Sequence, residues 1–147
     1  MKPLNSKEVK AVIKKINDQF DIEAELNYYF FMNNKNRLYI VNKEYFNENM
    51  NVKHIGMYFA EYKNDEIRLS IEGAQLIYNF EPKKNVFEIT DIENWLKGND
   101  LEIEHEDTTF MIIKYKDDVL GSGKIKNNKL LNYIPKIRRL KSVFLTD

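Results

Sequence analysis

The chain has 147 residues, 43% of them hydrophobic, and its 23 basic residues balance its 23 acidic residues. It has no cysteine, which excludes disulfides, a thiolate nucleophile and a cysteine metal site among these residues. No apolar run approaches the roughly 18 residues that span a bilayer, and the N-terminus lacks a signal-peptide core. We therefore expect a cytoplasmic protein with no membrane partner.

Residues 6–20 predict an amphipathic helix. Apolar side chains recur three and four residues apart in this segment and so fall on one face of a helix. Asn5 is a good N-cap, and Glu8 three residues later completes the pattern of a capping box. The residues of the apolar face are Val9, Val12, Ile13, Ile16 and Phe20.

The following part of the chain predicts two hairpins and two short helices. The expected strands are rich in aromatic and β-branched side chains, and the expected turns are rich in Asn and Asp. In chain order the elements are a strand at 27–32, a turn at 33–36, a strand at 37–41, a helix around 43–48, a strand at 54–62, a turn at 64–65, a strand at 66–71 and a helix from about 71 to 78.

The last third predicts mainly strands. Asp91 and Gly98 mark the start and the end of a helix at residues 92–97. The apolar run within residues 109–115 is typical of a buried central strand, and Asn127 with the Asn after it predicts a tight hairpin turn. The expected strands are 86–89, 109–115, 119–126 and 129–133.

These elements together indicate an α+β fold. One longer helix and a hairpin come first, and short strands that form a small antiparallel barrel with short peripheral helices come after them. No linker rich in Gly, Pro or Ser divides the chain. The best boundary lies near residues 47–51, which gives a helix-and-hairpin extension at residues 1–50 and a second domain at residues 51–147.

The charges are distributed unevenly along the chain. Residues 119–145 carry seven basic residues and no acidic one, whereas residues 1–118 carry 16 basic and 22 acidic residues. The chain has only four arginines, and Arg138 and Arg139 are adjacent. Arginine is the better phosphate ligand, because its planar fork donates two parallel hydrogen bonds. The segment therefore indicates an edge that binds a polyanion.

A simpler interpretation of this segment remains open, because a charge run is often only a solvated face and edge lysines block aggregation. Two features favour nucleic acid. Tyr133 offers an aromatic face on which a base stacks, and Pro135 favours an extended conformation at the residue before it, which predicts a stiff, exposed segment at 132–136. The glycine pair at 121–123 lacks the third glycine of a phosphate loop, so it indicates either a bulge or close approach of a nucleic-acid backbone.

The densest acidic run, Glu102–Asp107, contains His105, one of only two histidines. A metal site is conceivable there, but a solvated loop is favoured because no second histidine lies nearby. His54 is expected at the edge of a hairpin, and no Ser/His/Asp arrangement stands out. We therefore expect no catalytic residue, no metal and no cofactor.

Three blocks of the chain resemble one known domain. They are Gly56–Ile77, with two strands and a helix; Asn94–Leu101, with a Leu-x-Gly-x-x-Leu pattern; and Gly121–Lys124, followed by Leu131–Lys136 and the pair Arg138-Arg139. Over residues 52–141, and in this order, they are similar to the C-terminal RNA-binding domain of Sun/Fmu-type ribosomal RNA cytosine-5 methyltransferases. Stand-alone proteins of this kind look typical of archaea.

This resemblance implies a PUA-like fold, which is a small mixed β pseudo-barrel with peripheral helices, and it implies binding of structured RNA. The methyltransferase domain is not expected, because residues 1–50 are too short to bind the methyl donor and the attacking cysteine is missing. One departure from the family is Leu130-Leu131, where the methyltransferases tend to have a lysine. Basic side chains would contact phosphates, and an Asn and a Tyr would meet sugar or base. The predicted RNA-binding residues are Lys124, Lys126, Asn132, Tyr133, Lys136, Arg138, Arg139 and Lys141.

The resulting hypothesis is a non-catalytic protein that recognises structured RNA, ribosomal or transfer, in ribosome biogenesis, rRNA processing or tRNA modification. The first alternative is an adaptor whose basic C-terminal edge binds a separate methyltransferase or a ribosome-assembly factor. The second alternative is an enzyme with an unrecognised site in the loop at residues 102–107.

Overall fold

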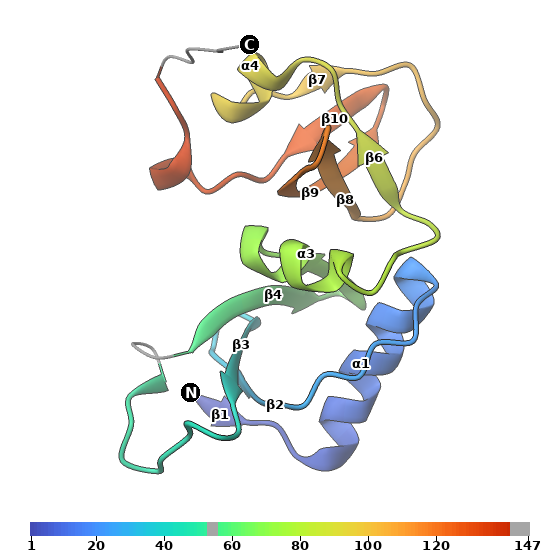
Figure 1. The fold of residues 1–147 in the computed structure, drawn as a ribbon. Helices are drawn as coiled ribbons and strands as arrows, with labels where there is room; N and C mark the ends of the chain where they lie inside the picture. The colour runs from blue at the N-terminus through green and yellow to red at the C-terminus, as the bar shows by residue number, and fades with distance from the viewer. Residues whose placement is uncertain (53–55, 142–147) are drawn as a thin grey trace.

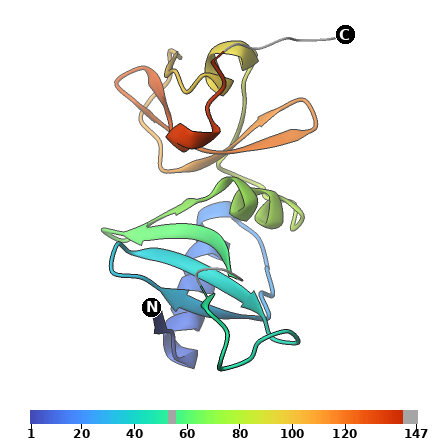
Figure 2. The same ribbon diagram turned by 90° about the vertical axis from the view of Figure 1, so that its left-hand side faces the viewer.

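The computed structural model describes residues 1–52 and 56–141 of the chain. Figure 1 shows two β-sheets, one above the other, with helix α3 (Ile71–Tyr78) between them. The side view in Figure 2 shows the same layers, with the N-terminal half of the chain below this helix and the C-terminal half above it. The predicted α+β class is confirmed. Among the described residues each sheet is open, so the expected barrel is not closed.

The first sheet is antiparallel throughout, and its strands follow one another in chain order. Its strands are β1 (Lys2–Pro3), β2 (Tyr28–Met32), β3 (Arg37–Asn42), β4 (Met57–Lys63) and β5 (Glu66–Leu69). The two predicted hairpins supply β2 to β5, whereas the short strand β1 has no signal in the sequence. His54 lies outside the described residues.

Residues 43–48 form turns and irregular backbone where the sequence predicts a helix, so this prediction is wrong. Asn42 accepts the backbone N–H of Glu44 through its side-chain oxygen, and Asn47 accepts that of Asn49 in the same way, each at 2.9 Å. Such local bonds give the backbone an alternative to helical hydrogen bonds, which explains the difference.

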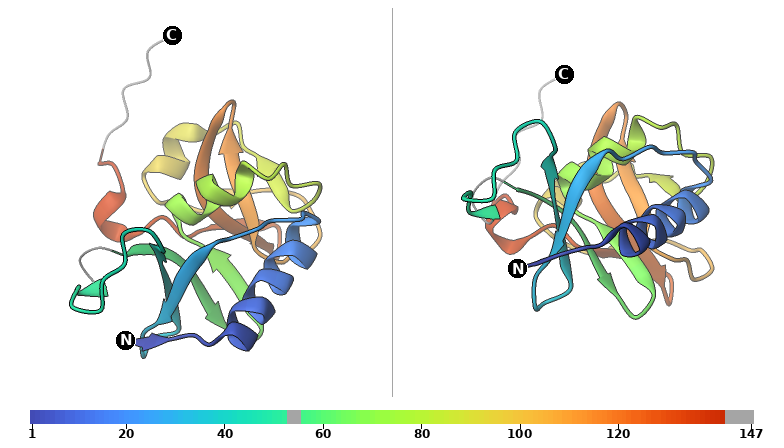
Figure 3. Two further views of the ribbon diagram at one scale, coloured as in Figure 1. Left: turned by 60° about the horizontal axis from the view of Figure 1, so that its bottom comes forward. Right: turned by 90° about the horizontal axis from the view of Figure 1, so that it is seen from below.

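Helix α1 (Ser6–Phe20) confirms the predicted amphipathic helix. The backbone N–H of Asn5 donates to Glu8 Oε1 at 3.1 Å, and the N–H of Glu8 donates to Asn5 Oδ1 at 2.9 Å, which completes the predicted capping box. Figure 3 shows α1 lying along the first sheet, and the core of this half includes its buried side chains. No helix within residues 1–52 and 56–141 is both long and apolar enough to pass through a membrane. The buried side chains of α1 are Val12, Ile16 and Phe20.

Helix α3 packs closely on β4 because Gly73 has no side chain. A Cβ at this position would collide with the backbone oxygen of Phe59. Ser70 caps the helix: its hydroxyl accepts the N–H of Gly73 at 2.9 Å and donates to the carbonyl of Tyr58 at 2.7 Å. The helix is thereby fixed on the upper edge of the first sheet, where the second sheet begins.

The second sheet has the order β6-β8-β9-β10-β7, and all neighbours are antiparallel except β6 and β8. β8 is an interior strand of this sheet and its apolar residues are buried, as predicted, whereas the short strand β7 was not predicted. Asp91 caps α4 as expected, through a bond from the Asn94 N–H at 3.2 Å. The elements are β6 (Val86–Glu88), α4 (Ile92–Leu96), β7 (Leu101–Glu102), β8 (Met111–Tyr115), β9 (Asp118–Lys126), β10 (Lys129–Asn132) and the 3₁₀ turn η1 (Lys136–Arg138).

The sheets divide the chain between β5 and β6, and two hydrophobic clusters largely follow this division, except that Ile112 of β8 is buried in the first of them. The boundary that the sequence places near residue 50 separates β3 from β4, although these strands pair directly, with Arg37 opposite Glu61. The halves are also bonded to each other, because the hydroxyl of Ser122 in β9 donates to the carbonyl of Leu69 in β5 at 2.7 Å.

Candidate nucleic-acid interface

The eight predicted residues do not lie along one continuous edge. Lys124 lies at the seam between the two sheets, and Lys126 lies at the tip of the β9–β10 hairpin. Asn132 ends β10, and Tyr133 follows it. The remaining four cations form a segment that we call the basic tail: Lys136, Arg138, Arg139 and Lys141, all exposed.

Lys124 is partly buried at the seam. Its ammonium group lies 3.0 and 3.2 Å from the two carboxylate oxygens of Glu66 in β5 and 4.8 Å from the ring centroid of Phe110. Only 23% of its side chain is exposed. Lys124 thus links the two sheets, and this pairing argues against the phosphate contact that the sequence predicts.

The hairpin tip is bonded to the acidic loop at residues 102–107. The backbone N–H of Asn127 donates to Asp107 at 3.0 Å, and the N–H of His105 donates to Asn128 at 3.1 Å. The neighbouring Lys129 lies 3.9 Å from Glu102. Lys126 therefore lies on a hairpin whose tip is bonded to an acidic loop, and the carboxylates of this loop reduce the attraction of this end for a polyanion.

The acidic loop has a structural use in this arrangement, since it fixes the hairpin tip. Its single histidine, His105, lies edge-on to the ring of Phe87 at a centroid distance of 6.3 Å. In the part of the chain that the structure describes, no group of three or more His, Asp and Glu side chains is arranged to hold a metal ion.

Asn132 uses its whole side chain to join β10 to α4. Its amide group donates to the carbonyls of Trp95 at 2.8 Å and Asn99 at 3.0 Å, and its side-chain oxygen accepts the N–H of Ile134 at 2.8 Å. Its backbone N–H donates to Asp100 at 2.8 Å. Asn132 therefore holds the start of the segment that leads to the basic tail, and its side chain is already engaged in the free protein.

The basic tail is fixed on the end of α4. The N–H of Leu140 donates to the carbonyl of Leu96 at 2.9 Å, and Arg139 Nε donates to the carbonyl of Ile134 at 2.9 Å. The aliphatic part of Arg139 lies directly on Gly98, where an added Cβ would collide with it. Gly98 thus has two roles, because it also ends α4 with a positive φ of 90°.

The segment at residues 132–136 is extended only as far as Pro135, after which η1 turns the chain. Arg138 forms an ion pair with Glu72 in the first turn of α3, and the two side chains are 47% and 41% exposed. In Figure 1, η1 lies at the left of the upper half, and the acidic loop lies at the right. The tertiary structure therefore separates the basic tail from the acids of the hairpin tip.

The first sheet contributes Arg68 to the same seam, a contact that the charge pattern of the sequence does not predict, and Arg37 lies on the same sheet beside Tyr58. The guanidinium carbon of Arg68 lies 4.9 Å from the ring centroid of Tyr133, and that of Arg37 lies 5.6 Å from the ring of Tyr58. Arg68 also forms an ion pair with Glu61 at 2.7 Å. The sequence did contain a signal for this contact: the chain has only four arginines, so each of them was a candidate for phosphate binding.

Burial raises the pKa of the Tyr58 hydroxyl above its ordinary value, against the opposing effect of Arg68 and then Arg37. Tyr58 is therefore neutral at physiological pH and keeps its proton as a hydrogen-bond donor. A half-exposed aromatic ring with arginines beside it is a surface that suits a nucleobase.

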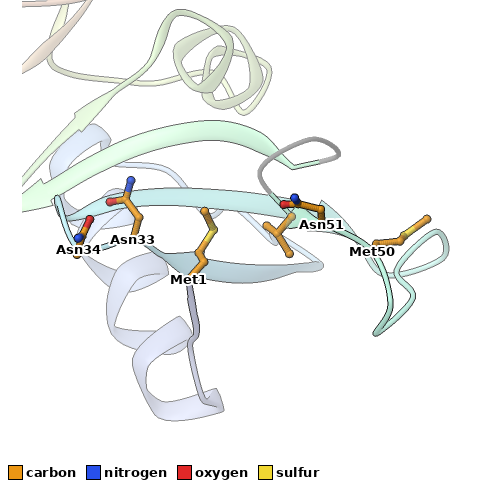
Figure 4. Close-up of a pocket in the computed structure, with 6 residues that line it drawn as sticks. Met1, Asn33, Asn34, Met50 and Asn51 are labelled. Atoms are coloured by element: carbon orange, nitrogen blue, oxygen red, sulfur yellow. The ribbon is translucent and has the colours of Figure 1, made fainter.

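Two cavities differ in the charge of the residues that line them. The larger, about 620 Å³, lies at the edge of the first sheet (Figure 4), where Met1 lies between the turn of Asn33 and Asn34 and the segment of Met50 and Asn51. Its lining has no charged side chain, and it is distant from the basic tail. The second, about 300 Å³, lies at the seam between the sheets and includes Arg68, Tyr133 and Arg138 in its lining. The seam is thus the better site for an anionic ligand.

Comparison with protein families matches residues 84–140 to the domain described as the methyltransferase RsmF PUA domain. The match begins just before β6 and ends within the basic tail, so it contains the whole second sheet. It confirms a PUA-like domain that resembles the C-terminal domain of Sun/Fmu-type methyltransferases. The upstream block at Gly56–Ile77 lies outside the matched residues. Comparison with curated proteins gives no match.

Proposed function

We propose, from the PUA-like domain of residues 84–140, that this protein binds structured RNA, ribosomal or transfer, in ribosome biogenesis or RNA modification. In this proposal the chain holds the RNA and carries out no chemistry on it. Any modification of the bound RNA would be the work of a separate enzyme, such as a methyltransferase. The family match supports the RNA-binding part of this proposal.

One observation carries the proposal: the basic tail is a row of exposed cations on a fixed backbone. Leu140 is bonded to α4, Arg139 lies on Gly98, and Arg138 is bonded to α3. Cations that are already positioned lose less conformational freedom on binding than those of a flexible tail. The tail therefore offers phosphates a pre-formed surface.

Recognition would rest on the phosphate backbone and on shape. The major groove of duplex RNA is too deep and narrow for side chains to read, so a protein meets the duplex through phosphates and 2′-hydroxyls. The arginines at 138 and 139 can each present a planar fork to a phosphate. The acidic loop at residues 102–107 would repel RNA and so confine it to the face of the tail.

The direct test is a fluorescence-anisotropy titration of the protein with total tRNA and with a ribosomal RNA fragment over a series of salt concentrations. Each neutralised phosphate contributes about −0.7 to −0.9 to the log–log slope of affinity against salt. Four tail cations would thus give a slope of about −3. Absence of binding at low salt would contradict the proposal.

A protein partner is the second candidate, because the tail also exposes apolar side chains. Ile137 is 93% exposed, and Leu140 is 45% exposed. Apolar side chains between cations suit an acidic groove on a methyltransferase or a ribosome-assembly factor. Salt-sensitive capture of such a protein, together with no affinity for RNA, would favour this adaptor function.

A further inference from the structure

The cavity at the seam has a volume of about 300 Å³ and is bounded by both halves of the molecule. We call it the seam slot. The first sheet and α3 supply one wall, and β9 with the segment that leads to η1 supplies the other. The lining residues that matter for its chemistry are Tyr58, Arg68, Leu120, Tyr133, Pro135 and Arg138.

The lining combines flat apolar surface with arginines. Tyr133 is held at a fixed angle, because its ring meets that of Phe110 edge-on at a centroid distance of 5.2 Å and the guanidinium of Arg68 at 4.9 Å. Leu120 and Pro135 add apolar surface beside it. A ligand that suits this slot has a planar, largely apolar part and an anionic part, as a nucleotide does.

The size of the slot limits the occupant to one small group. A volume of about 300 Å³ is at the lower end of the range for ligand sites, so one nucleotide can enter and a duplex cannot. Sequence-specific RNA recognition typically uses such single, unstacked bases, which stack on aromatic rings.

Arg138 belongs both to the slot and to the basic tail, so the two surfaces are continuous. Its partner in the free protein is the carboxylate of Glu72, which also lines the slot, and the pair is half exposed. An exposed ion pair contributes little, so a phosphate can replace the carboxylate at the arginine fork. RNA that lies on the tail would thereby place its next nucleotide at the entrance of the slot.

We propose that the seam slot binds one unpaired nucleotide of the RNA, with its base against Tyr133 and its phosphate on Arg138. This inference rests on the proposed RNA-binding function and adds a preference: the protein would select structured RNA that has an unpaired nucleotide beside a duplex. The first sheet would take part in this recognition through Tyr58 and Arg68, although it lies outside the residues that match the family.

The test compares two RNA hairpins that are identical except for a single-nucleotide bulge in one of them. Fluorescence anisotropy should show that the unmodified protein binds the bulged hairpin about ten-fold more tightly, which is the size expected of one base stacked on an aromatic ring. Tyr133→Leu should remove this preference, so that this variant binds the bulged and the fully paired hairpin with equal affinity. Tyr133→Phe, which keeps the ring, should retain the preference.

Tyr133 also packs on Phe110, so Tyr133→Leu could fail to fold. A second variant therefore tests the slot without changing Tyr133. Leu120→Trp fills the slot and leaves both tyrosines in place, so it should also abolish the preference for the bulge. Tyr45→Leu is the matched control, because Tyr45 is exposed and does not line the slot. Thermal unfolding of each variant shows which of them are folded.

The outcomes separate the two proposals. Equal affinity of the unmodified protein for both hairpins would overturn the nucleotide slot and leave the RNA-binding function in place, and the slot would then suit a protein segment. A preference that persists in both Tyr133→Leu and Leu120→Trp would overturn it as well. No binding of either hairpin at low salt would overturn both proposals.

Discussion

The ammonium group of Lys124 in β9 lies 3.0 Å from the carboxylate of Glu66 in β5, so one ion pair joins the two sheets. The sequence placed this lysine among phosphate ligands. The structure gives it a partner in a strand 58 residues away. Residues that share a charged segment in the sequence can therefore have different functions in the fold.

Lys124→Ala should lower the free energy of unfolding by about 1–2 kcal/mol and leave RNA affinity nearly unchanged. The change removes a partly screened ion pair and the contact between the ammonium group and the ring of Phe110. Urea denaturation measures the stability, and Lys126→Ala, at an exposed position, is the control. A large loss of RNA affinity with unchanged stability would show that Lys124 is a phosphate ligand after all.

Asn132→Ala should destabilise the protein by about 2 kcal/mol, because it removes three side-chain hydrogen bonds and leaves partly buried carbonyls without a donor. The midpoint of urea denaturation should fall with little change in its slope. Asn34→Ala, in the exposed turn between β2 and β3, should have almost no effect. Equal stability of the two variants would refute the structural role of Asn132.

The double variant Arg138→Ala with Arg139→Ala should weaken RNA binding and reduce the salt slope by about 1.5, while the fold stays intact. The double variant Lys126→Ala with Lys129→Ala removes the same charge from the hairpin tip and should have a much smaller effect. Circular dichroism checks both folds. If the affinity for RNA falls by the same factor in both double variants, the net charge of the protein determines binding and the basic tail does not.

Glu72→Gln should tighten RNA binding a few-fold at low salt, because it releases Arg138 from its ion pair and removes a negative charge from the seam. Asp18→Asn is a matched control, since Asp18 also forms an exposed ion pair, with Lys14 in the distant helix α1. Anisotropy titration of both variants makes the comparison. Weaker binding by Glu72→Gln would mean that the Arg138–Glu72 pair orders the tail for RNA.

Local signals explain why most elements could be predicted. The capping box of Asn5 and Glu8, the helix stop at Gly98 and the turn at Asn127 each depend on neighbouring residues only, and each is present in the structure. The helix expected at residues 43–48 failed for the same local reason, since the turn bonds of Asn42 and Asn47 competed with it. The strands β1 and β7 are too short to show a pattern.

The sequence by itself determined the position of most strands in the second part of the chain and the presence of a basic segment that contains no acidic residue. Only the tertiary structure decided which cations are available, because pairing across the sheets occupies Lys124 and the acidic loop is bonded to the hairpin tip next to Lys126. It also brought Arg68 beside Tyr133, 65 positions further along the chain. Contacts of this kind depend on how the two sheets pack against each other. The hydrophobic periodicity of the sequence indicates helices and strands, but it does not indicate which side chains of different sheets meet.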